Sequence, residues 1–135
     1  MNILITGGAS GLGEAITKRF AQATGNTIYF TFNQSAENAK KIKGDFANAV
    51  SIKCDFGNTT EIKSLTDRIA QLDLDVLINN AYSGDFLKTH FHKVPSEIFL
   101  NDFKENLIPT IEITQAAINW FRKKKQGKII TILTS

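Results

Sequence analysis

The chain has 135 residues, of which 42% are hydrophobic and 21% are charged, and its formal net charge is +3. This balance indicates one globular domain with a hydrophobic core and excludes a disordered or low-complexity chain. No apolar run approaches the roughly 20 residues that cross a bilayer, and the first residues already resemble a strand, so we expect neither a membrane partner nor a targeting peptide. The single cysteine, Cys54, excludes an internal disulfide and a cysteine-based metal cage, and we expect a cytoplasmic protein.

Apolar runs and helical stretches alternate along the chain, which predicts a regular succession of strands and helices. Strands are expected over 2–6, 26–32, 49–54, 74–78 and 128–133. Helices are expected over 12–23, 35–43, 59–71 and 106–125, with a helical region from Ser96 and a loop over 82–95 before the last of them. Crossovers of this kind give a parallel sheet with helices on both faces. The sequence therefore predicts an α/β fold without a second domain.

Local signals predict how these helices begin, pack and end. The first helix is expected to bury the apolar residues that recur at helical spacing, namely Leu12, Ala15, Ile16, Phe20 and Ala23. Ser35 is the expected N-cap of the second helix, and Thr59 or Thr60 that of the third. Pro109 predicts that the long helix begins or kinks there, and Gly127 is expected to end it.

The most basic stretch, residues 122–128, lies at the expected C-terminus of the long helix. Cations there complement the helix dipole, and no aromatic residues alternate with them as a nucleic-acid stacking surface requires, so we expect no nucleic-acid partner. Trp120 and Phe121 are expected to be packing residues. His90 and His92 have no carboxylate pattern beside them, which favours a surface or substrate-side loop over a metal site.

A glycine-rich loop, Thr6-Gly7-Gly8-Ala9-Ser10-Gly11-Leu12-Gly13, lies between the first strand and the first helix. The N-terminus of a helix presents unpaired backbone N–H groups and the positive end of the dipole, which together favour a phosphate. Gly7 permits a tight turn, Gly11 the close approach of a pyrophosphate, and Gly13 the packing of the helix against the strand. Ser10 adds a hydroxyl donor. The alternative, a flexible turn, is disfavoured by the strand–loop–helix context.

The spacing Thr-Gly-x-x-x-Gly-x-Gly resembles the cofactor loop of the short-chain dehydrogenases/reductases, and further segments match that family's pattern in the same order. Asp55, after the third strand, resembles the aspartate that contacts the adenine amino group. Asn79-Asn80-Ala81 resembles the Asn-Asn-Ala-Gly motif, although Tyr82 stands in place of the glycine. Asn106 resembles the catalytic asparagine that kinks the long helix, and residues 127–135 resemble the fifth strand that leads into the catalytic serine.

The resemblance covers the whole chain and implies a Rossmann-like, doubly wound parallel sheet in three layers, with strand order 3-2-1-4-5. Residues 1–135 would form an NAD(P)-binding domain whose cofactor contacts come from Gly7, Ser10, Gly11, Leu12, Gly13, Asn33, Asp55, Phe56, Asn80 and Ala81. The implied catalytic residues are Asn106, which holds a water for the proton relay, and Ser135, which hydrogen-bonds the substrate carbonyl. Thr134 is the alternative for the serine position.

The family's catalytic Tyr-x-x-x-Lys motif, whose tyrosine is the general acid and base, does not occur in this sequence. Its two tyrosines, Tyr29 and Tyr82, are followed four residues later by Asn33 and Phe86. The chain as written is therefore expected to be catalytically silent, with a sheet that is incomplete beyond the fifth strand. Two explanations stand: a piece of a longer enzyme, which we favour, and a naturally short, non-catalytic nucleotide-binding remnant or sensor.

The residues after the second strand decide between the nicotinamide cofactors. An acid there would bind both ribose hydroxyls and repel a 2′-phosphate, but the chain has Asn33-Gln34-Ser35 and no acid before Glu37. These neutral donors favour NADP(H), with NAD(H) as the alternative. The resemblance thus implies an oxidoreductase that transfers hydride between NADP(H) and a small carbonyl or alcohol substrate, in a homo-oligomer paired through the long helix. The residues 79–81 disfavour another doubly wound class, such as a methyltransferase.

Overall fold

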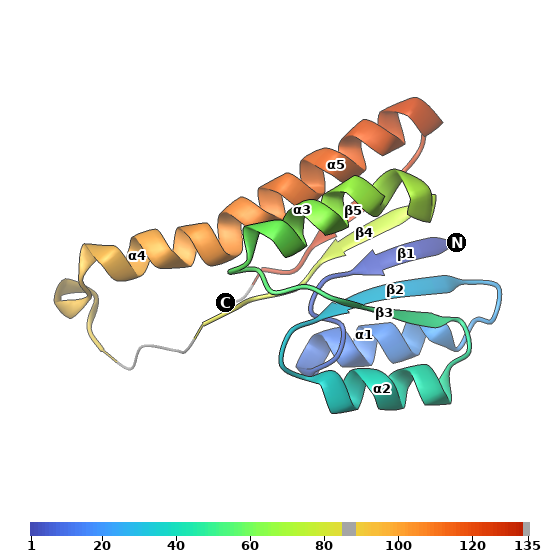
Figure 1. The fold of residues 1–135 in the computed structure, drawn as a ribbon, viewed down its shortest axis with the longest axis horizontal. Coiled ribbons are helices and arrows are strands. Elements are labelled where there is room, and N and C mark those ends of the chain that lie inside the picture. The colour runs from blue at the N-terminus through green and yellow to red at the C-terminus, as the bar shows by residue number, and fades with distance from the viewer. Residues whose placement is uncertain (85–88, 134–135) are drawn as a thin grey trace.

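The computed structural model describes residues 1–84 and 89–133. Five parallel strands form one sheet in the order β3-β2-β1-β4-β5, which confirms the strand order expected from the sequence (Figure 1). The strands are β1 (Asn2–Ile5), β2 (Thr27–Phe32), β3 (Ala49–Lys53), β4 (Val76–Asn79) and β5 (Lys128–Thr131).

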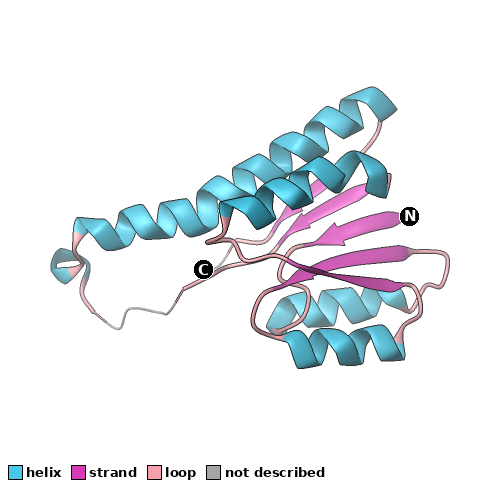
Figure 2. Ribbon diagram, viewed as in Figure 1, coloured by secondary structure: helices cyan, strands magenta, loops and turns pink. Residues whose placement is uncertain are grey.

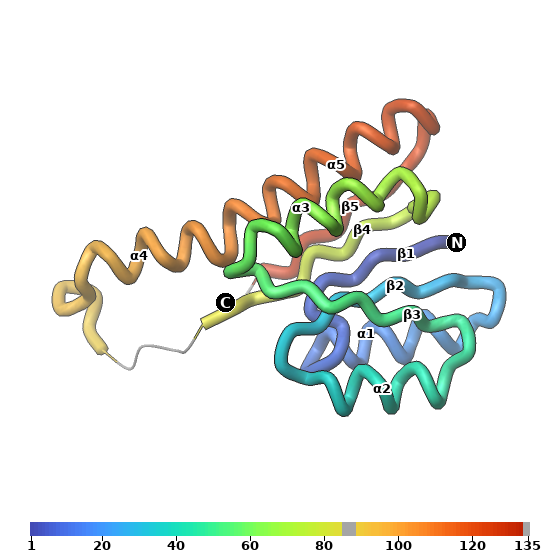
Figure 3. Tube along the Cα trace, in the orientation of Figure 1, coloured from blue at the N-terminus to red at the C-terminus, as the bar shows by residue number. Residues whose placement is uncertain are grey.

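Helices cover both faces of this sheet, with α1 (Gly11–Ala21) and α2 (Ala36–Asp45) on one face and α3 (Thr59–Arg68) and α5 (Ile108–Lys124) on the other (Figure 2). A 3-10 turn, Ile69–Leu72, extends α3, and another spans Phe91–Lys93. A π-helical turn, Phe103–Leu107, joins α4 (Ser96–Asp102) to α5 in one rod that reaches beyond the sheet (Figure 3). In the two described ranges no helix combines the length and the apolar character needed to cross a bilayer.

The core lies on both faces of the sheet because the central strands are apolar on both sides. Successive side chains of a strand point to opposite faces, so Leu4 packs toward α3 and α5 while Ile3 and Ile5 pack toward α1 and α2. Leu77 and Ile78 divide in the same way. The sheet thereby holds the carboxyl ends of β1 and β4 side by side in a rigid frame.

The buried face of α1 differs from the one expected from its sequence. Gly13, Thr17 and Ala21 are the buried residues, spaced four apart, whereas Leu12, Ala15 and Ala23 are exposed and Ile16 and Phe20 are partly buried. The small residues let the helix lie close to the sheet, because the axis can approach only where no large side chain intervenes. Leu12, which is 59% exposed, is thereby left free to face solvent beside the glycine loop.

Two helix ends also differ from the expectation, the start of α3 and the end of α5. Asn58, not Thr59 or Thr60, caps α3, because its side-chain oxygen accepts from the backbone N–H groups of Thr60 and Glu61. The prediction that the long helix begins or kinks at Pro109 is confirmed: α5 begins at Ile108 after the π-helical turn, and a proline in the first turn of a helix costs no hydrogen bond. Lys125, with φ of 60°, ends α5 in the left-handed conformation expected of Gly127. Ser35 is the N-cap of α2 as predicted, but its side chain makes no capping bond.

One lysine of the basic C-terminus of α5, Lys124, is bound to the fold, whereas Arg122, Lys123 and Lys125 are exposed. Lys124 Nζ lies 2.7 Å from Asp75 Oδ1 and 3.0 Å from Asp73 Oδ1. Hydrogen bonds from Lys124 and from the backbone N–H of Asn2 hold the pKa of Asp75 below its usual value. Trp120 donates from Nε1 to the carbonyl oxygen of Leu74 at 3.2 Å. These bonds attach the C-terminal end of α5 to the residues that precede β4.

Gly127 is needed for packing, and its replacement should destabilise the protein. A Cβ at this position would fall within the ring of Phe121, which is a buried core residue. We expect Gly127→Ala to lower the free energy of unfolding by about 1–3 kcal/mol in denaturant titrations, as overpacking does. Gly44 in α2 has open space around it, so Gly44→Ala is the matched control and should stabilise by about 0.5–1 kcal/mol. Equal stabilities of the two variants would contradict the packing of Phe121 on this turn.

Candidate functional site

A cavity of about 610 Å³ opens at the carboxyl ends of β1, β2, β3 and β4. Four segments line it: the glycine loop, the loop after β2, the end of β3 and the loop after β4. The lining residues are Gly7, Ala9, Ser10, Leu12, Gly13, Thr31, Phe32, Asn33, Gln34, Ser35, Cys54, Phe56, Asn80, Ala81, Tyr82, Ser83 and Gly84. The chain order of the strands reverses between β1 and β4, and ligands of open α/β sheets bind in the crevice at such a point.

Glycine is required at three positions of the loop, each for a different physical reason. Gly7 has φ of +65°, and a Cβ there would lie 2.9 Å from the Cα of Ala81. A Cβ at Gly13 would strike the carbonyl oxygen of Gly7 and the amide of Asn80, so this glycine packs against the loop itself rather than against the strand as expected. At Gly11 a Cβ would meet only open space, so packing does not require a glycine there. Its φ of +52° does, because other residues rarely adopt this conformation. Gly7 and Gly13 are therefore required by packing within the site, and Gly11 by its backbone conformation.

Thr6 and Asn80 hold the glycine loop against the end of β4. Thr6 Oγ1 accepts from the backbone N–H groups of Asn80 and Ala81, both at 3.0 Å. In return Asn80 Nδ2 donates to the carbonyl oxygens of Thr6 at 3.1 Å and Gly7 at 3.2 Å. The sequence analysis assigned Asn80 and Ala81 to the cofactor and missed Thr6, whose clue was a polar residue at the buried end of a strand.

The opposite side of the loop is fastened to β2. Thr31 Oγ1 accepts from the backbone N–H of Gly7, and the Thr31 carbonyl oxygen accepts from that of Gly8, each at 2.9 Å. A Cβ at Gly8 would lie 2.6 Å from both Phe30 Cβ and Thr17 Oγ1, so this part of the loop is packed tightly. The loop therefore has little freedom to change shape.

Asn38 of α2 forms a third attachment. Its Nδ2 donates to the carbonyl oxygen of Ala9 and to Glu14 Oε2, both at 2.6 Å. Hydrogen bonds from Lys18 and from Asn38 hold the pKa of Glu14 below its usual value. Ser10 is the N-cap of α1 without a side-chain capping bond, so its hydroxyl and the first N–H groups of the helix are available to an anion.

The residues that follow β3 form another wall of the cavity. Cys54 and Phe56 line the cavity, whereas the carboxylate of Asp55 accepts from the backbone N–H of Gly57 at 2.9 Å and closes a turn. Burial raises the pKa of the Cys54 thiol to about 11, so it is a neutral wall residue at physiological pH and not a nucleophile. Of the two residues at this end of β3 that were expected to bind the cofactor, Phe56 lines the cavity and Asp55, expected to contact the adenine, is not among the lining residues.

Asn106 lies in the π-helical turn and holds the loop after β4. Its Oδ1 accepts from the backbone N–H of Ser83 at 2.6 Å, and its Nδ2 donates to the Ser83 carbonyl oxygen at 2.7 Å and to Asp102 Oδ1 at 2.9 Å. Tyr82, at the position of the family's glycine, donates its hydroxyl to the same Asp102 oxygen at 3.2 Å. Desolvation and this bond raise the pKa of Tyr82. The expected serine position, Ser135 or Thr134, lies outside the described residues.

Asn79 joins the strand to its neighbours rather than to the cavity. Its Nδ2 donates to Thr114 Oγ1 of α5 at 3.0 Å and lies 3.4 Å from Thr131 Oγ1 of β5.

The two histidines that were weighed as a metal pair lie in the segment before α4, where the rings of His90 and His92 stack with centroids 5.8 Å apart. Residues 1–84 and 89–133 contain no group of three or more potential metal ligands.

Comparison with known proteins identifies the relatives of this chain. A family model described as short chain dehydrogenase matches residues 1–135. The chain is 29% identical over 141 residues to 3beta-hydroxysteroid dehydrogenase 2 of Eggerthella lenta, covering 94% of this chain and 50% of that protein. It is 30% identical over 137 residues to a 3-oxoacyl-acyl-carrier-protein reductase of Aquifex aeolicus, covering 96% and 53%. The chain thus spans about half the length of the curated relatives it matches.

Solved structures show the same architecture. The closed form of a serine dehydrogenase complexed with NADP+ superposes with a TM-score of 0.83 at 25% identity, covering 100% of this chain and 54% of that one. A short chain dehydrogenase from Burkholderia cenocepacia J2315 in complex with NADP has a TM-score of 0.75 at 28% identity, covering 96% and 53%.

The Thr6 hydroxyl should contribute more to stability than its size suggests. Thr6→Val preserves the shape but leaves the N–H groups of Asn80 and Ala81 without their acceptor, at a cost of about 1–3 kcal/mol for each buried donor. Thr6→Ser is the control, because it keeps the oxygen and loses a methyl group worth about 1 kcal/mol. Chemical unfolding of both variants checks this. A Val variant at least as stable as the Ser variant would show that these hydrogen bonds do not hold the loop.

Proposed function

The chain belongs to the short-chain dehydrogenase family, and from that membership we propose that it binds NADP(H) in this cavity for hydride transfer to or from a carbonyl or alcohol substrate. The observation that carries the proposal is the glycine loop, held open at the N-terminus of α1 on the wall of a cavity at the switch point of the sheet.

The residues present fit a nicotinamide dinucleotide. Gly7 and Gly13 let the loop pack closely on its neighbours, and Gly11, around which a Cβ would meet nothing within 4 Å, leaves open space for the approach of a ligand. The cavity volume is within the range of small-molecule and cofactor sites. When bound, the nicotinamide ring supplies or accepts the hydride.

We assign each part of the cofactor to residues of this chain. Ser10, Leu12 and the backbone around Gly11 and Gly13 would hold the pyrophosphate, where the N–H groups and dipole of α1 favour negative charge. Asp55 and Phe56 would enclose the adenine, and Asn33 would bind the adenosine ribose. Asn80 and Ala81, which Thr6 fixes in position, would support the nicotinamide ribose.

The substrate end of the site contains Asn106, and Ser135 or Thr134 would complete it from β5. Asn106 would hold a water for proton relay, and the hydroxyl would orient the substrate oxygen, because hydride transfer to a carbonyl leaves an alkoxide that needs a proton. The general acid belongs to a Tyr-x-x-x-Lys motif, which the 135 residues do not contain. We therefore propose that this chain is the cofactor-binding portion of a longer enzyme. Sequence beyond residue 135 decides between this and a non-catalytic nucleotide-binding protein.

NADP(H) is favoured over NAD(H) by the loop after β2. Asn33, Gln34 and Ser35 line the cavity there, and among residues 1–84 and 89–133 no acidic residue lines it. The hydroxyl of Ser35 makes no capping bond, so it is free to donate to a phosphate. Two solved relatives are described as complexes with NADP+ or NADP, which supports the same choice.

Cofactor affinity should depend on Gly13. Gly13→Val places a branched side chain on the Gly7 carbonyl and the Asn80 amide and should weaken NADP+ binding by more than about tenfold in calorimetry, because the cradle must open. Gly25→Ala is the control, since a Cβ there meets nothing within 4 Å. Unchanged affinity of a folded Gly13→Val protein would place the pyrophosphate elsewhere.

Hydride transfer should require sequence that follows these residues in the gene. We expect the 135-residue chain to oxidise NADPH no faster than background with any carbonyl, since loss of general acid catalysis costs about 10²–10⁴-fold. The protein from the complete gene should be active and should carry Tyr-x-x-x-Lys soon after Ser135. In that protein Ser135→Ala should lower kcat more than Thr134→Ala, which serves as the neighbouring control. A complete gene without the motif would instead identify the non-catalytic protein, and robust activity of the short chain would refute the assignment of the proton donor.

A further inference from the structure

A lysine of β3 lies beside the adenosine end of the cavity. Lys53 Nζ donates to Asn33 Oδ1 at 2.8 Å, and Asn33 lines the cavity. Parallel pairing places Lys53 opposite Phe32, and the Cys54 N–H donates to the Phe32 carbonyl oxygen at 2.9 Å, so the two strands remain paired to their ends. The sheet thus brings a cation to the loop that the sequence between 33 and 35 lacks.

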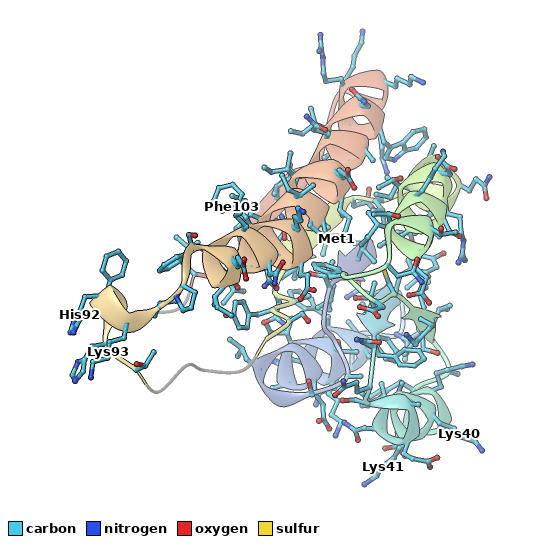
Figure 4. The ribbon with its side chains drawn as sticks, turned by 60° about the vertical axis from the view of Figure 1, so that its left-hand side comes forward. Met1, Lys40, Lys41, His92, Lys93 and Phe103 are labelled. Carbon is cyan, nitrogen blue, oxygen red and sulfur yellow. The ribbon has the colours of Figure 1, made fainter. Side chains whose placement is uncertain are left out.

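The charged groups around Lys53 leave its ammonium group able to bind an anion. Its other partner is Glu61 Oε1 at 3.7 Å, and the second oxygen of Glu61 is occupied by the Asp55 N–H, from which it accepts at 2.8 Å. An exposed pair at that distance contributes little, and the Lys53 side chain is 47% exposed. The lysines of α2 do not compete for this position, because Lys40 and Lys41 point outward from the helix (Figure 4).

We propose that Lys53 recognises the 2′-phosphate of NADP(H) and sets the choice of cofactor, an inference that rests on the function proposed above. Asn33 positions it: its oxygen holds the ammonium group at the rim of the cavity. Within the described part of the chain the Asn33 amide has no further side-chain bond, which leaves its Nδ2 to donate to the same phosphate. Lysine suits this role as a compact point charge on a flexible stem.

The specificity group therefore comes from β3, not from the glycine loop or the loop after β2. A bond from an ammonium to a phosphate is charge-assisted and stronger than a neutral one. It exists only when the 2′-phosphate is present, so the contribution of Lys53 must be confined to NADP(H). NAD(H), which carries a hydroxyl at the same position, is the natural reference ligand.

The test compares NADP+ and NAD+ binding by isothermal titration calorimetry in the full chain, without any need for turnover. Lys53→Gln should weaken NADP+ binding by about tenfold or more and change NAD+ binding by less than about twofold. Lys53→Arg, which keeps the charge, should retain most of the preference. Lys63→Gln is the matched control, because Lys63 is an exposed lysine on α3 that pairs with Asp67 at 2.8 Å. Thermal unfolding of each variant confirms that the fold is intact.

Each outcome separates this inference from the function on which it rests. A selective loss of NADP+ affinity in Lys53→Gln, rescued in Lys53→Arg and absent in Lys63→Gln, supports it. Equal loss for both cofactors, no loss, or a wild-type protein that binds NAD+ as tightly as NADP+ overturns the role of Lys53 while the cofactor site stands. A wild-type protein that binds neither cofactor overturns the proposed function itself.

Discussion

The reciprocal hydrogen bonds between Thr6 and Asn80 determine where every other part of the site lies. They join the carboxyl ends of β1 and β4, the strands between which the chain order reverses, and give the N–H groups of Asn80 and Ala81 their acceptor. Gly7 and Gly13 are glycines because this junction brings backbone against backbone. The phosphate loop is therefore shaped by its contact with β4 and not by its own flexibility.

The two ends of the cavity are held by different kinds of contact. The glycine loop is attached to β2, to α2 and to the residue after β4 through its backbone groups, which bond to Thr31, Asn38 and Asn80. The loop after β4 is held by side-chain bonds of Asn106 and Tyr82 that converge on Asp102, and Tyr82 is 58% exposed. Three separate segments of the fold thus hold the glycine loop, whereas Tyr82 and Ser83 are held by side chains of the single rod formed by α4 and α5.

The sequence predicted the parts of this structure that depend on local pattern, and missed those that depend on neighbours distant in sequence. Alternating apolar runs were sufficient for the strand order, whereas the phosphate site at the glycine loop stays a prediction. The burial of Thr17 instead of Leu12 depends on how closely α1 approaches the sheet, which periodicity does not encode. The bond between Lys53 and Asn33 joins residues 20 apart and exists only through the register of β2 and β3.

That register gives a physical reason why cofactor preference is hard to read from one strand. In a parallel sheet the carboxyl ends of adjacent strands meet at one edge, so a ligand beside β2 is within reach of side chains from β3. A missing acid after β2 removes a repulsion, whereas an attraction requires a cation, and here the cation is supplied by the neighbouring strand. In the proposed site the absence of a negative charge at Asn33 and the presence of a positive charge at Lys53 are separate determinants of cofactor choice. The sheet brings Lys53 Nζ within 2.8 Å of Asn33 Oδ1.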